Sequence, residues 1–299
     1  MSERVVNLKD PIIENLIDSL AARVEKNVAV GGDCYYDDKG LLCCPVCGEN
    51  KQCVITLGNR TRIVPSCCRC DRERLEREKQ ELEQAMELAN IRTRKENCFG
   101  HPAQWRHTFE NDDGRHGKMD IIREYCRRWN DPEFDRPGLI LTGDVGTGKS
   151  YAAECIANYL CEHKTRAVML NLSEALNNIS SAKDRQQNIR ELTEYPMLII
   201  DDFGIERYSD YALENIFNLI DNRCRSEKPL IVTTNLSYDQ FMACAGGIER
   251  RICDRIIGMC VPVSFSGSSG RLAIGAARTE SFRSGLSGAV QIAPAVAYD

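Results

Sequence analysis

Residues 143–150 read Gly-Asp-Val-Gly-Thr-Gly-Lys-Ser and fill every fixed position of the pattern G-x-x-x-x-G-K-[ST]. In this pattern the glycine-rich turn points backbone N–H groups at phosphate oxygens, and the following helix adds the positive end of its dipole. The lysine adds a point charge, and the final hydroxyl can bind Mg²⁺. The sequence therefore predicts a nucleotide-phosphate site made of Gly143, Asp144, Val145, Gly146, Thr147, Gly148, Lys149 and Ser150.

Two acidic residues follow an apolar stretch further along the chain. Residues 197–200 are Met-Leu-Ile-Ile, and Asp201 and Asp202 come directly after them. A carboxylate at the carboxyl end of a buried strand can join the magnesium shell, and a second one can orient or deprotonate water. We assign the magnesium role to Asp201 and the water role to Asp202. A core strand that ends in a turn is the alternative.

Residues 229–235, Pro-Leu-Ile-Val-Thr-Thr-Asn, indicate another buried strand that ends in polar residues. A parallel sheet would bring Asn235 between the two strands that carry the nucleotide residues, where it could act as a sensor-1 polar group. Asn is also common as a helix cap or turn residue, which is the alternative here.

A basic stretch follows in which Arg251 and Arg255 share one face of a predicted helix. Arginines in this place fit the role of a finger that reaches the γ-phosphate held by a neighbouring subunit. The alternative is a pair of surface arginines that form ion pairs with Glu249 or Asp254.

Cysteines form two clusters near the N-terminus. Cys44 and Cys47 make a C-x-x-C knuckle, and Cys70 closes the second cluster after a short hairpin pattern. This is zinc-ligand spacing, and the fourth ligand is either Cys67 or Cys68. A closed four-sulfur site leaves no open position for catalysis, so we expect a structural knuckle for protein or nucleic-acid contact. Reduced cysteines without a metal are the alternative.

The predicted nucleotide residues need a sheet to position them, and the sequence pattern from about Phe99 to Ile274 predicts one. Apolar runs alternate there with helical segments, which predicts an α/β domain with a parallel sheet flanked by helices. The chain has 299 residues, 42% hydrophobic residues and a net charge of −5, which excludes a uniformly basic nucleic-acid coat. No apolar stretch is long enough for a membrane span or signal peptide, so we expect a cytoplasmic protein whose 16 cysteines are mostly free thiols.

The remaining stretches differ in composition and define the predicted domains. The N-terminal stretch has apolar residues at helical spacing, which leaves an apolar stripe that needs a partner. A charged stretch after the cysteines indicates a solvated linker helix, and the C-terminal stretch is rich in Ala, Gly and Ser. The predicted domains are an amphipathic helix (1–30), a zinc knuckle (31–70), a linker helix (71–98), an ATPase domain (99–275) and a disordered tail (276–299).

Together these segments resemble the DnaC/DnaI/IstB-type AAA+ ATPases, and specifically the zinc-containing helicase loaders of Gram-positive bacteria and their phages. The resemblance spans residues 33–271 and is carried by residues 40–47, 107–114, 143–150, 198–204 and 233–236. It implies an AAA+ P-loop core with ATP, Mg²⁺ and Zn²⁺ as cofactors. It also implies that the closing knuckle is C-x-C, which favours Cys68, that Arg255 is the trans-acting finger with Arg251 beside it, and that Arg271 is a sensor-2 arginine.

The activity that the resemblance implies is ATP-dependent loading of a hexameric replicative helicase onto single-stranded DNA, with self-association through the ATP sites. Asp202 stands where most such ATPases have Glu, which suggests slow, switch-like hydrolysis. Residues 171–190, with Lys183, Arg185 and Arg190, are candidates for DNA contact. The alternatives are an IstB-like helper of DNA transposition and a non-hydrolysing adaptor that binds ATP as a structural ligand.

Overall fold

The structure is a computed structural model that describes residues 34–57, 60–114, 118–204, 209–243, 246–267, 275–276 and 278–282. The predicted N-terminal helix of residues 1–30, the sensor-2 candidate Arg271 and most of the predicted tail lie outside these residues. The chain divides into two compact units, Met1–Leu88 and Ala89–Asp299, and each is described by itself.

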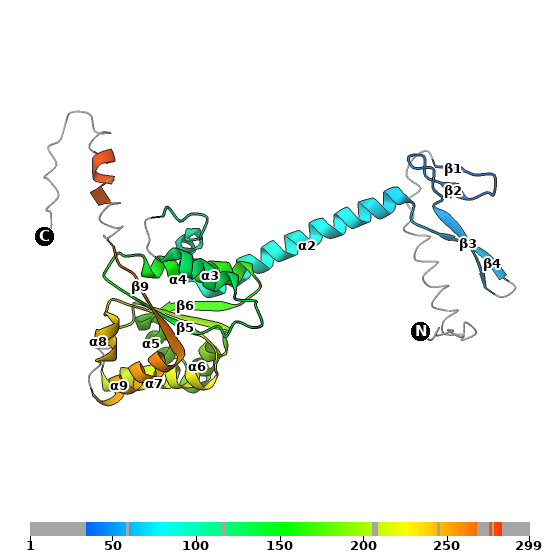
Figure 1. Cartoon of the computed structure of the whole chain (residues 1–299). Coiled ribbons are helices and arrows are strands. Elements are labelled where there is room, and N and C mark those ends of the chain that lie inside the picture. Colours follow the sequence, from blue (N-terminus) through cyan, green and yellow to red (C-terminus); the bar gives the residue numbers. More distant parts are fainter. Residues whose placement is uncertain are drawn as a thin grey trace. The chain divides into compact units, whose positions relative to one another are not determined.

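The larger unit is a three-layer α/β/α sandwich, as the sequence predicts. Its five-stranded sheet is parallel, with the strand order β6-β7-β8-β5-β9. Figure 1 shows α3 and α4 on one face of the sheet and α5, α6, α7 and α9 on the other. The strands are β5 (Gly138–Thr142), β6 (Ala167–Asn171), β7 (Met197–Asp201), β8 (Leu230–Thr234) and β9 (Cys260–Ser264). The helices are η1 (Pro102–Arg106), α3 (Met119–Arg127), α4 (Lys149–Glu162), α5 (Leu172–Ser181), α6 (Arg185–Glu194), α7 (Asp210–Arg225), α8 (Tyr238–Met242) and α9 (Gly247–Met259).

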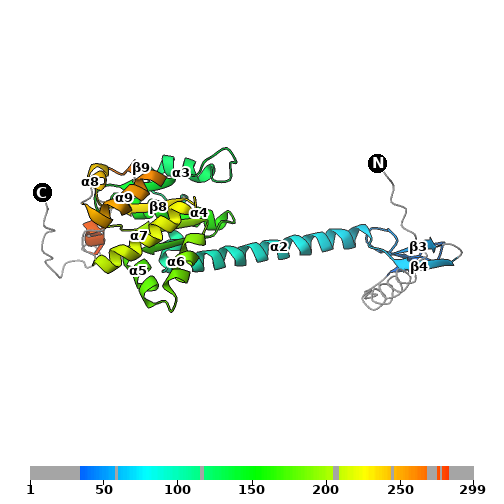
Figure 2. The same cartoon turned by 90° about the horizontal axis from the view of Figure 1, so that it is seen from below.

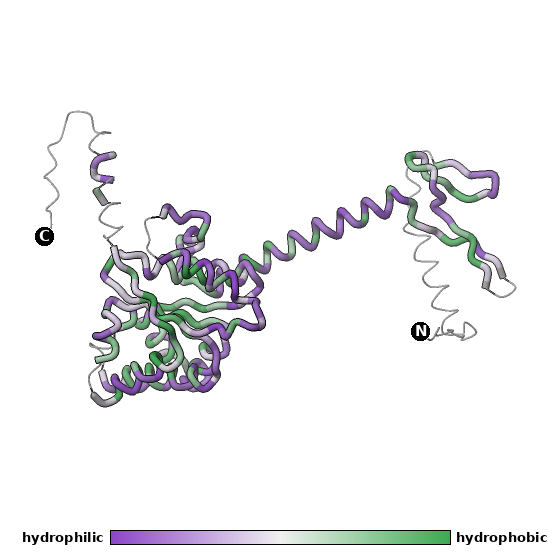
Figure 3. Tube along the Cα trace, viewed as in Figure 1, coloured by the Kyte–Doolittle hydropathy of each residue, from purple (hydrophilic) through white to green (hydrophobic). Residues whose placement is uncertain are grey.

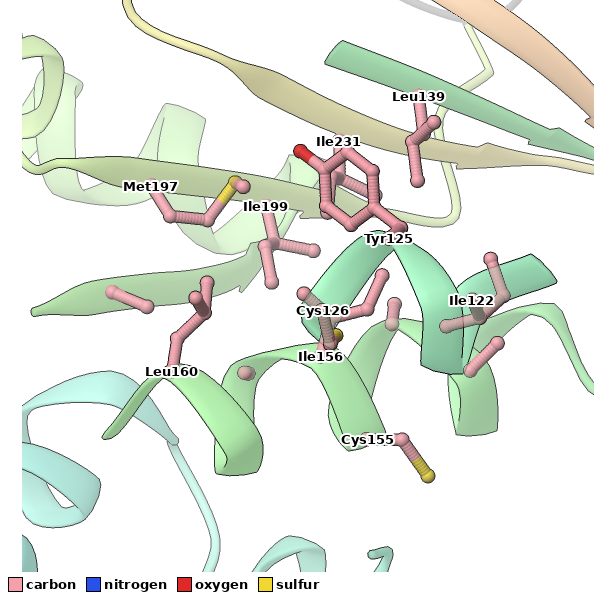
Figure 4. Close-up of a cluster of buried hydrophobic side chains, with 14 of the residues drawn as sticks. Ile122, Tyr125, Cys126, Leu139, Cys155, Ile156, Leu160, Met197, Ile199 and Ile231 are labelled. Atoms are coloured by element: carbon pink, nitrogen blue, oxygen red, sulfur yellow. The ribbon is translucent and has the colours of Figure 1, made fainter. Parts of the chain in front are cut away.

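Both faces of the sheet are apolar in its central strands β5, β7 and β8, because helices cover these strands on two sides. Successive side chains of a strand point to opposite faces, so Leu139 and Leu141 of β5 pack with α3 and α4. Ile140, between them, packs with the helices of the opposite layer. Figure 4 shows the first of these clusters, with Ile122 and Ile156 directed at the sheet. These two layers fix the strand ends that carry the predicted nucleotide residues.

The smaller unit contains short antiparallel strands and the beginning of a long helix. Strands β1 (Tyr35–Tyr36) and β2 (Leu42–Cys43) pair with each other, and β3 (Gln52–Leu57) pairs with β4 (Arg60–Pro65). Helix α2 (Arg69–Cys98) then runs on into the larger unit. Figure 3 shows this helix as mostly hydrophilic along its length, which fits the predicted solvated helix. Among the described residues, no helix is both long and apolar enough to cross a membrane.

Arg223, in the last turn of α7, is completely buried and joins the starts of two strands. Its guanidinium donates to the backbone carbonyls of Thr193 at 2.8 Å, Tyr195 at 2.6 Å and Pro196 at 3.2 Å, just before β7. It also donates to Pro229 at 3.2 Å, just before β8. Burial lowers the pKa of Arg223 to about 10, so the side chain still carries its charge at neutral pH.

We expect Arg223→Met to destabilise the larger unit by at least about 3 kcal/mol, since several buried carbonyls lose their donor and each unsatisfied group costs about 1–3 kcal/mol. Urea unfolding followed by tryptophan fluorescence measures this, because the two tryptophans, Trp105 and Trp129, both lie in this unit. Arg225→Met is the matched control, because the Arg225 side chain is 78% exposed. If the two variants have equal unfolding free energies, the prediction is wrong, and water hydrogen-bonds to the carbonyls that the Arg223 guanidinium bonds in wild type.

Candidate functional site

The loop of residues 143–148 connects β5 to α4, and two of its glycines have backbone roles. Gly143 has φ +137°, and a Cβ there would lie 2.0 Å from the carbonyl oxygen of Phe265, next to β9. Gly148 has φ +102° and precedes the first residue of α4. Residues other than glycine rarely adopt these angles. Gly143 is therefore required by the close approach of Phe265, and Gly148 by the turn into α4.

Lys149 is the first residue of α4 and is only 6% exposed. Its Nζ donates to the carbonyl oxygens of Gly143 and Asp144, at 2.7 Å each. The positive charge is thus held at the centre of the loop, with Ser150 following on the first turn of the helix. A helix N-terminus, a curled loop and a buried cation together form a site that suits phosphate groups.

The two acidic residues predicted at the end of β7 are held by Thr233 of the neighbouring strand β8. The Thr233 hydroxyl donates to Oδ1 of Asp201 at 2.6 Å and accepts from the backbone N–H of Asp202 at 2.9 Å. Asp202 has φ +53°, which is an uncommon angle for a residue other than glycine. Backbone strain of this kind persists where the surrounding contacts fix it, and it is concentrated at functional sites.

Asn235 follows β8, which lies between β5 and β7. Its Nδ2 donates to Oδ1 of Asp202 at 3.0 Å. The amide therefore reaches the acidic pair from the strand that separates it from the phosphate-binding loop. The parallel strands bring Lys149, Asp201, Asp202 and Asn235 to one end of the sheet, as the sequence predicts, and this is the end where α/β proteins bind their ligands.

Arg251 and Arg255 lie on α9, which packs beside α7 (Figure 2). Nε of Arg255 donates to Oδ1 of Asp221 at 3.0 Å, and the same carboxylate binds Arg225 at 2.8 Å. The guanidinium carbon of Arg251 lies 4.1 Å from the ring centroid of Phe217. Within one chain, both arginines are thus held by α7, and the bond to Asp221 raises the pKa of Arg255.

The cysteine cluster is formed by Cys44, Cys47, Cys68 and Cys70, whose sulfur atoms all lie within 4.8 Å of one another. Four sulfurs around a tetrahedral zinc ion, each about 2.3 Å from the metal, lie about 3.8 Å apart, so this donor set fits Zn²⁺. Cys67 is exposed and is not part of the cluster, whereas Cys68 is completely buried. Backbone N–H groups of Cys70 and Glu49 donate to the Cys47 sulfur and lower its pKa to about 6.

Backbone and side-chain bonds join the two cysteine pairs. In the first knuckle the Gly48 N–H donates to the Cys44 carbonyl at 2.9 Å. The Glu49 carboxylate accepts from the Arg69 N–H at 2.6 Å and from Arg72 at 3.1 Å, so the knuckle is tied to the start of α2. The Cys68 thiol donates to Asp71 at 3.3 Å.

The sequence model of the family described as IstB-like ATP binding protein matches residues 69–276. The chain belongs to this family. The match covers most of the chain and includes the phosphate-binding loop, both acidic residues, Asn235 and the two arginines of α9.

This IstB-like protein is also similar to proteins named replicative helicase loader DnaC. It is 25% identical over 150 residues to the one from Buchnera aphidicola subsp. Acyrthosiphon pisum, covering 48% of this chain and 58% of the relative. To the one from Escherichia coli K12 it is 25% identical over 211 residues, covering 66% of this chain and 79% of the relative. The chain thus spans less than two thirds of the Buchnera relative. A solved structure titled crystal structure of the DnaI aligns at 21% identity with a TM-score of 0.48, covering 57% of this chain and 94% of that one.

Two contacts of this IstB-like protein were not predicted from its sequence. Thr233 bonds both acidic residues, but a threonine inside a β-strand is ordinary and gives no separate signal. Asp221 binds the predicted finger Arg255 across 34 positions of sequence, so no local spacing could reveal it. Of the candidate DNA-contacting residues, Lys183, Arg185 and Arg190 are all exposed on or beside α6.

Proposed function

We propose that this chain hydrolyses ATP with Mg²⁺, and that ATP controls its delivery of a hexameric replicative helicase onto single-stranded DNA. The observation that carries the proposal is the gathering of Lys149, the Asp201–Asp202 pair and Asn235 at one end of a parallel sheet. Membership of an ATP-binding family supports the nucleotide, and relatives named replicative helicase loader support the delivery. The same relatives do not favour a helper of transposition. We expect the protein to act in the cytoplasm.

The residues have separate roles in this proposal. Lys149 binds the phosphates, Ser150 and Asp201 hold Mg²⁺, and Asp202 orients the attacking water. Asn235 fixes Asp202 through its 3.0 Å hydrogen bond. The carboxylate of Asp202 is shorter than a glutamate and is held on a strained backbone, which supports slow, switch-like hydrolysis.

Self-association through the ATP sites is part of the proposal. Arg255 would reach the γ-phosphate bound by a neighbouring copy, with Arg251 beside it and Arg271 acting on its own chain's nucleotide. In the single chain the 3.0 Å bond to Asp221 holds the Arg255 side chain against α7. Exchange of that bond for a phosphate contact would make subunit association depend on ATP.

The zinc knuckle is proposed as a structural unit for contact with the helicase, with Cys44, Cys47, Cys68 and Cys70 as ligands. The exposed residues Lys183, Arg185 and Arg190 are proposed to contact the DNA backbone, and such contacts weaken as salt rises.

Mass photometry of the full chain with the hexameric replicative helicase of its host tests the delivery. We expect a complex larger than the helicase by several copies of this chain in ATP, and its loss in ADP or in a Lys149→Ala variant. If the chain binds ATP but no complex forms in any state, the proposal is wrong, and double-stranded DNA filaments of a transposition helper should be sought. A complex that forms equally in all states would indicate the non-hydrolysing adaptor.

We expect Thr233→Val to lower the rate of phosphate release by about 10–100-fold, a usual effect of removing a residue that orients a metal or catalytic ligand. The variant keeps the shape of the side chain but loses the hydroxyl that bonds Asp201 and Asp202. Affinity for a fluorescent ATP analogue should change little, because Thr233 has no place in the phosphate-binding loop. Thr233→Ser is the control and should keep most of the activity; equal rates for the two variants would contradict the positioning role.

A further inference from the structure

A hollow lies at the end of the sheet opposite the proposed ATP site. Its volume is about 540 Å³, which is in the range of ligand pockets. Its lining includes Arg136, Arg166, Pro196 and Pro229, which come just before β5, β6, β7 and β8 respectively. In a parallel sheet these positions share the amino-terminal edge, whereas the phosphate-binding loop follows the carboxyl end of β5. The two sites are therefore separate.

Most of the charged side chains that line the hollow are basic, although the whole chain is acidic with a net charge of −5. Local excess of one charge inside a concave surface raises the local concentration of the opposite charge. The basic residues are Arg136, Lys164, Arg166 and Lys228, and the acidic residues are Asp135 and Glu227.

Three of the basic residues are available to a ligand. Lys228 binds Glu194 at 2.7 Å, but no carboxylate of the described residues lies within ion-pair distance of Arg136, Lys164 or Arg166. All three are exposed. The N–H groups of these three side chains can therefore reach a charged group outside the chain.

Both arginines lie over aromatic rings. The guanidinium carbon of Arg136 lies 5.7 Å from the ring centroid of Trp129, and that of Arg166 lies 5.6 Å from that of Tyr195. Trp129 is itself fixed, because its Nε1 donates to Thr165 at 3.2 Å. A guanidinium stacked on a ring keeps its N–H edge free, and that edge matches the oxygens of a phosphate.

The backbone around the hollow is also unusual. Arg136, Lys164 and Glu227 have φ angles of +50°, +63° and +53°. Positive φ is uncommon for residues other than glycine and costs free energy, so the surrounding structure must hold these turns in place. Each of these three residues lies two or three positions before a strand of the sheet, so the backbone that carries Arg136 and Lys164 is anchored there.

We propose that this hollow binds phosphate groups, as a site separate from the phosphate-binding loop and from Lys183, Arg185 and Arg190. With a nucleic-acid ligand the proposal rests on the proposed function and adds a DNA-binding surface to it. Two guanidiniums that lie over aromatic rings, with a lysine lining the same hollow, suit the tetrahedral, multiply charged phosphate. The phosphate groups belong either to a nucleic-acid backbone, which supplies them in series, or to a small phosphate compound. An acidic peptide is less well matched, because Asp135 and Glu227 at the rim repel a flexible chain of carboxylates.

The test compares two double variants of the full chain with equal charge change. Arg136→Gln/Arg166→Gln removes both stacked guanidiniums of the hollow. Arg92→Gln/Arg127→Gln removes two exposed arginines elsewhere, whose side chains are 74% and 72% exposed. Binding is measured in saturating ADP and Mg²⁺ with a fluorescein-labelled thymidine 20-mer by anisotropy, and with inorganic pyrophosphate and polyglutamate by calorimetry. Lys164→Gln is a milder third variant that reports on the hollow if the first double variant does not fold.

If the hollow binds phosphate, the affinity for the oligonucleotide or for pyrophosphate falls by at least about tenfold in the hollow variant, as expected for two lost charge-assisted hydrogen-bonding groups. The control variant stays close to wild type. For the oligonucleotide, the slope of log affinity against log salt also falls by roughly 1.4, because two phosphate contacts are lost. If the affinity falls for only one of the two ligands, that ligand identifies the source of the phosphate.

The proposal is overturned if neither phosphate ligand distinguishes the hollow variant from the control, or if polyglutamate alone does so. The upward shift of the unfolding temperature caused by ADP serves as a separate readout of the proposed ATP site. It should be the same in the hollow variant and in wild type. If ADP does not raise the unfolding temperature of wild type, the proposed function is wrong. The comparison of the two double variants would still test the hollow.

Discussion

If the four-sulfur cluster holds zinc, as proposed, a Cys68→Ser variant is expected to lose the metal and the folded structure of residues 34–70, whereas Cys67→Ser keeps both. Cys68 is completely buried and its sulfur lies in the four-sulfur cluster, while the neighbouring Cys67 is exposed and outside it. Zinc contributes about 10–16 kcal/mol to the folding of small zinc peptides. Among the described residues, neither large buried apolar cluster includes a residue before Cys98, so we expect the folding of this segment to depend on a bound metal.

Mass spectrometry of the metal content and hydrogen exchange of residues 34–70 measure the two effects. Wild type and Cys67→Ser should hold zinc in stoichiometric amount and protect the backbone of the β3–β4 pair. Treatment of wild type with a strong chelator should reproduce the exchange pattern of Cys68→Ser. If Cys67→Ser loses zinc while Cys68→Ser retains it, the fourth ligand is Cys67 and the prediction is wrong. If the wild-type protein holds no metal and its hairpin is still protected, zinc has no part in folding this unit.

The choice between these two cysteines shows what spacing alone can decide. Both Cys67 and Cys68 lie at distances along the chain that permit a fourth ligand, since C-x-x-C and C-x-C both occur at zinc sites. The structure separates them by burial, because the chain turns into α2 at Arg69 and directs one sulfur inward. Direction of a side chain depends on where a helix begins, and helix boundaries are the least reliable part of a sequence-based prediction.

The parallel sheet and the location of the nucleotide residues could be predicted because each is carried by a local pattern. The loop of residues 143–150 fills a known motif, and the strands that hold Asp201 and Asn235 are continuous apolar runs. Their meeting at one edge follows from parallel pairing, since carboxyl ends of parallel strands lie together. Local patterns were therefore enough to predict the fold and the end of the sheet at which the predicted nucleotide residues lie.

The contacts that support those residues could not be predicted in the same way. Arg223 occupies the last turn of α7, where a basic residue usually interacts with the helix dipole in water. Its complete burial depends on three carbonyls at the end of α6 and just before β7, far away in the sequence. Thr233 and Asp221 are likewise defined by partners more than 30 positions away. Such contacts depend on tertiary packing, so no local sequence motif predicts them.

Lys149→Ala is expected to lower ATP hydrolysis by about 10²–10³-fold, a usual effect of removing one group that stabilises transition-state charge. The Nζ charge is held between the carbonyls of Gly143 and Asp144, at the position where phosphate groups would lie. Without nucleotide the variant should be nearly as stable as wild type, because water can reach these loop carbonyls. With ATP at about 100 times its Kd, wild type should gain about 2.7 kcal/mol of unfolding free energy, and the variant should gain little.

Phosphate release and the ATP-dependent shift of the unfolding temperature measure the two parts of this expectation separately. Lys79→Ala is the matched control, because it removes the same charge from α2, where the side chain is 64% exposed. If Lys149→Ala loses hydrolysis but keeps the full ATP-dependent shift, the lysine acts on the transition state and the backbone of the loop alone binds the phosphates. If it keeps both, the loop does not bind nucleotide in the way that Lys149 and the neighbouring glycines indicate, and the ATP-controlled switch has no basis. Loss of both is the expected result, because we propose that a single buried cation at the start of α4 serves binding and chemistry together.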